Sequence, residues 1–368
     1  MSSQLSAIDG VQVPSRDAIE RQRYLFGPVV DFICLGGGSL MVIGVVALFL
    51  PMHTPPPRVL LYVVLFMATI LNFPHFVHSY QIFYARFGAK IAPEGGALRR
   101  RYFFAGIIMP IALLAAIAAA IGLKAPIGIA VLGSLFVFLT GWHYVKQGYG
   151  LLIVDSVLKR SFFQNWEKRL LVANCYAVWL SYLCVYNDGF GSNEVFSKLI
   201  VLVHVPEILV RASLFGSGVL LVAVLTMFGR RIVRGEPLPA LGTISYFTTL
   251  YIWLFLLLNP WFLLIVPAFH SLQYLVVVWR FKLSELSAGR GSRMRAFSGF
   301  LLFGFLVGIA VFIIVPLFLD SFIDYGGTAL GSGIFLFFFV VFINIHHYFL
   351  DNVMWRRENP DVRRFLMT

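Results

Sequence analysis

The sequence predicts an all-α polytopic membrane protein, a bundle of about ten transmembrane helices with both termini in the cytoplasm. Three observations support this class. Of the 368 residues, 59% are hydrophobic and only 12% are charged, whereas soluble domains carry about 25% charged residues. Apolar runs of roughly 20 residues, the length that spans a bilayer as a helix, recur along nearly the whole chain. Lysine and arginine gather in alternate connections between these runs, as the positive-inside rule requires.

The expected spans leave room for one transmembrane domain, residues 28–350, and for no soluble domain of useful size. The ten spans cover residues 28–51, 59–84, 103–122, 127–153, 169–187, 212–229, 241–258, 261–280, 297–319 and 331–350. Residues 1–27 form a polar N-terminal segment without a signal-peptide apolar region, so we expect it to stay in the cytoplasm. Residues 351–368 form a basic cytoplasmic tail. The stretch 188–212 is expected to be an amphipathic segment on the outer face or a re-entrant piece.

The basic residues test the order of the spans. The later cytoplasmic connections contain the stretches "ARFGAKIAPEGGALRRRY", "KRSFFQNWEKR", "RRIVR", "RFKLSELSAGRGSRMR" and "RRENPDVRR". The opposite connections hold fewer, namely Arg58, Lys124, Lys198 and Arg211. Topology and attraction to anionic lipid therefore explain the net charge of +12, and nucleic-acid binding is not expected. Short basic loops and the absence of a signal peptide favour a bacterial inner membrane.

The three cysteines, Cys34, Cys175 and Cys184, all lie in apolar runs and show no CxxC spacing. We expect these cysteines to pack among apolar side chains as small hydrophobic residues.

Six of the eight histidines lie inside expected spans, where polar groups are costly and tend to mark function. They are His75, His78, His143, His270, His346 and His347. Counting to the next cytoplasmic arginine places His75, His270 and His346 at one depth, roughly 15 Å from the boundary at 1.5 Å per residue. His143 fits this level less well. The other two, His53 and His204, lie near the outer face, where a solvated role is expected.

Polar neighbours follow these histidines at helical spacing. The pairs are His78 with Gln81, His143 with Gln147, His270 with Gln273, and His347 with Asp351. Residues three or four apart share a helix face, and an imidazole that binds a metal needs its second ring nitrogen fixed by such a partner. The sequence therefore predicts a metal centre with the six histidines as ligands and Gln81, Gln147 and Gln273 as supporting residues. Asp351 and Tyr274 are the candidate catalytic side chains.

Ligand chemistry narrows the choice of metal. Neutral imidazoles with one carboxylate suit iron, zinc or copper, whereas magnesium and calcium prefer oxygen ligands. We expect one or two irons, because six histidines exceed the need of one tetrahedral zinc and because a buried apolar site favours oxygen chemistry. Zinc, copper and haem remain alternatives. Histidines that only bond helices together, or that relay protons, are the simpler alternative.

The stretches "PHFVH", "WHYVKQ", "FHSLQY" and "HHYFLD" resemble those of histidine-box integral membrane oxygenases. This broad group includes desaturases, hydroxylases such as alkane monooxygenase, and bacterial membrane carotene-cleaving dioxygenases. Desaturases and hydroxylases usually have HxxxH and HxxHH, where this chain has HxxH, two single histidines and HHxxxD. The carotene-cleaving group, with dispersed histidines around one iron, is nearer in style. The resemblance implies iron-dependent oxidation of a hydrophobic molecule.

The sequence thus favours a membrane iron oxygenase whose lipid or isoprenoid-like substrate enters from the bilayer. If the reaction needs electrons, a redox partner would dock on the basic cytoplasmic loops. Two alternatives stay open at this stage. One is a transporter for a metal, haem or small solute, which should have a polar path on both sides of the site. The other is a subunit that binds haem or pigment.

Overall fold

The computed structural model describes residues 23–49, 58–92, 96–123, 125–191, 200–201, 203–254, 262–288, 292–322 and 333–367. Within these ranges every regular element is a helix, which confirms the all-α class. Seven helical segments are long and apolar enough to cross a membrane: Pro28–Val45, Gly96–Gly122, Pro126–Leu158, Asn165–Asn187, Glu207–Val233, Arg293–Phe322 and Ile334–Met354. The count of ten spans stays a prediction.

The first half of the chain forms long helices, several of which contain a π-helical turn. These elements are α2 (Pro28–Phe32), η1 (Ile33–Gly37), α3 (Gly38–Phe49), α4 (Arg58–Met67), η2 (Ala68–Asn72), α5 (Phe73–Tyr84), α6 (Phe87–Lys90), α7 (Gly96–Phe103), η4 (Phe104–Ile108), α8 (Met109–Gly122), α9 (Pro126–Leu158) and α10 (Asn165–Gly191). Proline at the first position of α9 follows an extended Ala125, as expected because proline lacks the N–H that a helix start leaves unbonded.

The second half is also helical, with one 3₁₀ turn, η5, and one π-helical turn, η6. Its elements are α12 (Glu207–Val233), α13 (Ala240–Tyr251), η5 (Ile252–Leu254), α15 (Phe262–Ser287), α16 (Arg293–Ile309), η6 (Ala310–Ile314), α17 (Val315–Phe322), α18 (Ile334–Met354) and α19 (Pro360–Phe365). The stretch 188–212 is only partly described. Its described part comprises the end of α10, an irregular piece up to Pro206 and the start of α12, and His204 in that piece is exposed. His53 lies outside the described residues.

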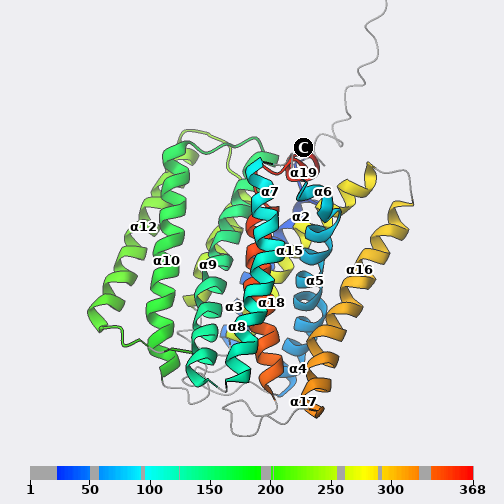
Figure 1. Ribbon diagram of the computed structural model, residues 1–368. Helices are drawn as coiled ribbons and strands as arrows, with labels where there is room; N and C mark the ends of the chain where they lie inside the picture. Colours follow the sequence, from blue (N-terminus) through cyan, green and yellow to red (C-terminus); the bar gives the residue numbers. More distant parts are fainter. Residues whose placement is uncertain are drawn as a thin grey trace, which may run out of the picture.

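Helix α18 occupies the middle of the bundle (Figure 1). Half of its membrane window is buried, compared with 11% for α12. Helix α18 packs against α5, α8 and α9, and α15 packs against α5. The side chains of α12 are mostly apolar and exposed, as in a helix that faces lipid. The buried histidines of the described residues lie on α5, α15 and α18, so this part of the bundle is where a site would lie.

The basic connections lie at the same end of the bundle as α19 and the C terminus (Figure 1). Buried contacts tie this end together. Arg231 Nη1 bonds Glu167 Oε2 at 2.9 Å, and Asn359 Nδ2 donates to Tyr102 Oη at 3.1 Å. This grouping is what the alternating charge predicts, although the assignment of this end to the cytoplasm stays a prediction. The three cysteines are free thiols, and Cys175 is buried in an apolar cluster.

Candidate metal centre

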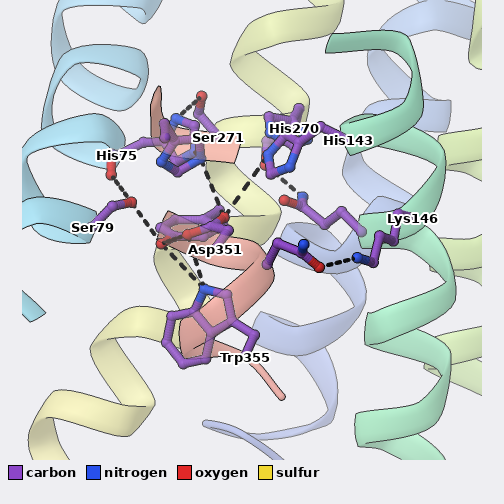
Figure 2. Close-up of polar contacts among 12 residues, drawn as sticks. His75, Ser79, His143, Lys146, His270, Ser271, Asp351 and Trp355 are labelled. Carbon is purple, nitrogen blue, oxygen red and sulfur yellow. Dashed lines mark hydrogen bonds and ion pairs between the residues drawn. The ribbon is translucent and has the colours of Figure 1, made fainter. Parts of the chain in front are cut away.

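Four of the six expected histidines come together in the core, one from each of four helices. His75 lies on α5, His143 on α9, His270 on α15 and His347 on α18. Their ring centroids are separated by 4.5 Å for His75 and His347, 4.9 Å for His143 and His270, and 5.0 Å for His143 and His347. Figure 2 shows His75 and His270 above Asp351, with His143 beside His270. These imidazoles therefore form one compact cluster, which we call the histidine cluster.

The ligand atoms of the cluster lie close enough to share an ion. His75, His143 and His270 each offer a ring nitrogen, and these atoms all lie within 4.8 Å of one another. The same limit holds for His143, His347 and Asp351. His143 belongs to both groups, and the Nε2 atoms of His75 and His347 are 3.0 Å apart. The two groups therefore form one continuous centre of four imidazoles and one carboxylate.

The two shortest separations are hydrogen-bond distances that are also compatible with neighbouring ligands of one ion. Metal–nitrogen bonds of about 2.1 Å at right angles place two ligand atoms roughly 3.0 Å apart, whereas tetrahedral angles place them roughly 3.4 Å apart. His75 Nε2 and His347 Nε2 are 3.0 Å apart, and His347 Nε2 is 3.2 Å from Asp351 Oδ2. His143 Nε2 lies 3.9 Å from the same oxygen. The residues present thus fit an ion with room for further ligands.

Several ring nitrogens of the cluster have no protein partner. Both nitrogens of His270, Nε2 of His143 and Nδ1 of His347 are buried without a hydrogen bond to the described residues. Leaving a buried polar group unbonded costs about 1–3 kcal/mol, so four such atoms in one place require an explanation. A bound ion would remove this cost for each nitrogen that coordinates it.

Ser271 fixes the tautomer of His75. The Ser271 hydroxyl donates to Asn72 Oδ1 at 2.5 Å, so its oxygen accepts from His75 Nδ1 at 3.2 Å. His75 therefore carries its proton on Nδ1 and presents the lone pair of Nε2 to the centre of the cluster. This is the arrangement in which a second hydrogen bond orients a ligating imidazole.

Asp351 is held on one side and faces the cluster with the other. Tyr274 Oη donates to Asp351 Oδ1 at 2.8 Å, and Trp355 Nε1 donates to the same oxygen at 3.2 Å. The Tyr274 hydroxyl also bonds Ser79 at 2.6 Å. Oδ2 is left to face His347 and His143 (Figure 2). Sequence reasoning included Tyr274 and Asp351 but missed Ser79, although it follows His75 by four residues and so shares its helix face.

Two local features interrupt the regular geometry of the helices beside the histidine cluster. Pro267 lies inside α15, three residues before His270, and a proline in a helix frees a backbone carbonyl and bends the axis. The π-helical turn η2 ends at Asn72, directly before α5 and His75, and such turns are frequent at functional sites. The His270 ring stacks on Tyr144 with centroids 3.8 Å apart.

The other two predicted ligands, His78 and His346, lie outside the histidine cluster. His78 Nδ1 bonds Gln81 Oε1 at 2.7 Å, and the ring stacks on Phe300. His346 Nδ1 bonds the Tyr80 hydroxyl at 2.6 Å, and its Nε2 bonds the Ala105 carbonyl at 2.9 Å. Both nitrogens of His346 are therefore occupied by protein atoms.

The expected glutamine partners behave differently from one another. Gln81 bonds His78 as the spacing predicts. Gln147 Nε2 donates to the backbone carbonyl of His270 at 2.9 Å and to Gln273 Oε1 at 3.2 Å. Gln273 Nε2 donates to the Leu35 carbonyl at 2.9 Å. Gln147 and Gln273 therefore tie α9, α15 and η1 together behind the cluster, and neither bonds a ring nitrogen.

A cavity of about 430 Å³ reaches the cluster from the basic end of the bundle. Its inner lining includes His143, Tyr274 and Asp351. Its outer lining includes Arg357 and Glu358, both of which are exposed. The cluster thus has a route to the membrane surface at the end where α19 lies.

The fold and the site define a class: a helical membrane protein with a buried histidine cluster that could bind a metal. No protein-family model matches the chain, and neither a curated protein nor a solved structure matches it.

Proposed function

We propose that the chain is an integral membrane metalloenzyme that uses non-haem iron to oxidise a hydrophobic molecule, such as a lipid or an isoprenoid-like compound. The ligands would be His75, His143, His270 and His347, with Asp351 as a fifth. One observation carries the proposal: imidazoles from four separate helices converge on one buried point, and there His143 Nε2 and a ring nitrogen of His270 have no protein partner among the described residues.

The donor set favours iron over the other ions. Imidazole and carboxylate are donors that suit iron, and the five ligands His75, His143, His270, His347 and Asp351 would leave one position of a six-coordinate iron free for a further ligand. The 3.0 Å separation of the His75 and His347 nitrogens suits six-coordination better than the tetrahedral geometry of structural zinc. Imidazole centroids only 4.5–5.0 Å apart leave no flat slot for a haem.

The chain's own residues would position the ion and protect it. Ser271 holds His75 in the tautomer that presents Nε2. Tyr274 and Trp355 hold Asp351 so that Oδ2 faces the cluster. Bound iron would supply the activation of oxygen, and the buried surroundings would exclude bulk water from the reaction. Substrate would approach the side of the cluster lined by His143, Tyr274 and Asp351, where the cavity ends.

The proposal also covers the membrane in which the protein lies and the source of electrons for the reaction. We infer a bacterial inner membrane with the basic end in the cytoplasm, where anionic lipid would attract the arginines. Electrons, where the reaction consumes them, would come from an acidic redox partner docked at that end.

The test is metal content together with an optical spectrum of purified protein in lipid nanodiscs. Wild type should hold one iron per chain without a Soret band, and His270→Ala and His143→Ala should each lose most of it. His346→Gln is the matched control, because His346 lies outside the cluster, and it should keep the iron. A folded wild-type protein that holds no metal and takes up none from ferrous, zinc or cuprous solutions would overturn the proposal.

A further inference from the structure

The cavity that reaches the histidine cluster is lined by both apolar and polar side chains. Its apolar lining, which we call the apolar wall, includes Leu151, Val154, Val277, Val362 and Leu366. Lys146, Asn352 and Arg356 form what we call the polar wall, and the lining also contains Arg357 and the carboxylates Asp351 and Glu358. A lining divided in this way is complementary to an amphiphile, because hydrocarbon and a polar group would each meet a surface of their own kind.

The lining of the cavity holds more cations, Lys146, Arg356 and Arg357, than carboxylates, Asp351 and Glu358. Lys146 Nζ donates to Asn352 Oδ1 at 2.6 Å, and Arg356 Nε donates to the Asn352 carbonyl at 2.7 Å. In the part of the chain that the structure describes, neither cation forms an ion pair with a carboxylate. A half-buried lysine within a membrane span is costly unless it has a function. Asn352 holds both side chains on the same wall, where they can meet one anion together.

The positions of Lys146 and Arg356 relative to the histidine cluster determine which part of a bound amphiphile would lie near the metal ligands. Lys146 follows His143 by three residues on α9, which corresponds to about 4.5 Å along the helix axis, and Arg356 lies two residues beyond the end of α18 at Met354. Both α9 and α18 run toward the basic end of the bundle (Figure 1). An anionic group bonded to Lys146 would therefore lie about one helical turn from His143.

We propose that the cavity binds an amphiphile with a single anionic group, a carboxylate or a phosphate, held by Lys146 and Arg356 while its hydrocarbon lies against the apolar wall. This inference rests on the proposed function for one point, that the bound amphiphile is the substrate of the enzyme. It restricts the proposed hydrophobic substrate to an anionic molecule. Lysine and arginine provide charge-assisted hydrogen bonds to such a group, which are about twice as strong as neutral ones.

Binding can be measured directly with radiolabelled dodecanoate, dodecyl phosphate and uncharged dodecanol, on protein in zwitterionic nanodiscs with empty discs subtracted. We expect both anions to bind at least about tenfold more tightly than the alcohol. The tighter of the two anions identifies the head group as a carboxylate or a phosphate. Lys146→Met and Arg356→Met should each remove most of the preference for the anions. Arg234→Met is the matched control, because Arg234 is exposed and lies outside the cavity lining.

A second pair of variants tests the location without touching the charges. Gly150 lines the cavity, and a Cβ there would meet no atom within 4 Å, so Gly150→Phe should fill the space and weaken all three ligands. Gly218→Phe on the exposed face of α12, where a Cβ is equally free, should bind like wild type. Equal affinity for dodecanoate, dodecyl phosphate and dodecanol would overturn the inference, as would wild-type binding in Lys146→Met and Arg356→Met.

The His270→Ala variant separates this inference from the proposed function. It should still bind the anions, because the head group is held by Lys146 and Arg356 and not by the ion. Loss of anion binding together with the metal would show that the anion is a metal ligand and would overturn the inference. A protein that prefers the anions but holds no iron would overturn the proposed function alone.

Discussion

The Nε2 atoms of His75 and His347 lie 3.0 Å apart, although 272 residues separate the two histidines in the chain. Ser271 keeps the proton of His75 on Nδ1, so His75 presents a lone pair across this gap. In the metal-free protein His347 can fill the gap by donating the proton on its Nε2. An ion in the cluster would replace that proton and take the lone pairs of both rings. The contact is therefore both a hydrogen bond between α5 and α18 and one edge of the candidate coordination sphere.

Tyr274 is expected to tune metal affinity through Asp351. Tyr274→Phe removes the hydroxyl that donates to Asp351 Oδ1, and loss of such a partner behind a ligand typically lowers metal affinity by about 10–100-fold. Competition with a chromophoric chelator measures this. Tyr251→Phe removes a hydroxyl that bonds Asn174 far from any ligand, and it should leave the affinity unchanged. Equal affinity in wild type and Tyr274→Phe would show that Asp351 is not a ligand that depends on this bond.

Tyr80 is expected to matter for stability and not for metal. Tyr80→Phe leaves His346 Nδ1 without its 2.6 Å partner, and an unbonded buried nitrogen costs about 1–3 kcal/mol. The thermal unfolding midpoint in detergent should fall while metal content stays that of wild type. Tyr62→Phe, at a side chain that is 70% exposed, should change neither quantity. A loss of metal in Tyr80→Phe would contradict the placement of His346 outside the cluster.

Gly304 on α16 is expected to tolerate no side chain. A Cβ on Gly304 would overlap the His78 ring and lie 2.7 Å from its Nδ1, so Gly304→Ala must push α16 away from α5. Overpacking of this kind costs about 1–3 kcal/mol. Gly299→Ala on the same helix meets no atom within 4 Å, and it should be neutral or stabilising by up to about 1 kcal/mol because alanine favours helix. Unfolding midpoints that shift equally in both variants would contradict this contact.

The orientation of the bundle can be tested by labelling single cysteines with an impermeant maleimide in whole cells. In a background with alanine at Cys34, Cys175 and Cys184, Arg234→Cys should react only after the membrane is opened, because it lies at the basic end. His204→Cys, which is exposed in the connection before α12, should react in intact cells. The opposite pattern would invert the predicted topology.

The depth of the site was only partly predictable. Counting to the next basic residue placed His75 and His270 at one level, and the structure brings both into the cluster. The same count set His143 apart, yet its ring lies 4.9 Å from that of His270. The reason is the length of α9, whose 33 residues extend about 50 Å at 1.5 Å per residue. The first basic residue after α9 therefore lies farther along the helix axis than the basic residue that follows a shorter helix. A count back from it gives the wrong depth for His143.

The choice of ligands was less predictable still. His346 and His347 are neighbours, and residues one position apart point about 100° apart around a helix. One of them must face a different neighbour from the other, and the sequence contains one indication of which: Asp351 follows His347 by four residues, whereas Leu350 follows His346 by four. The packing of α18 makes the choice: it turns His347 toward α5, α9 and α15, and it turns His346 toward Tyr80 and Ala105.

The class of the molecule follows from composition and pattern, because an excess of apolar residues in runs of helical length leaves a membrane bundle as the stable arrangement. The same runs place imidazoles inside the bundle. Which imidazoles meet depends on the packing of the helices, because helix rotation and tilt follow from contacts between distant segments and not from the residues of one helix. His75, His143, His270 and His347 converge with Asp351 for that reason, and His78 and His346 bond to the protein instead.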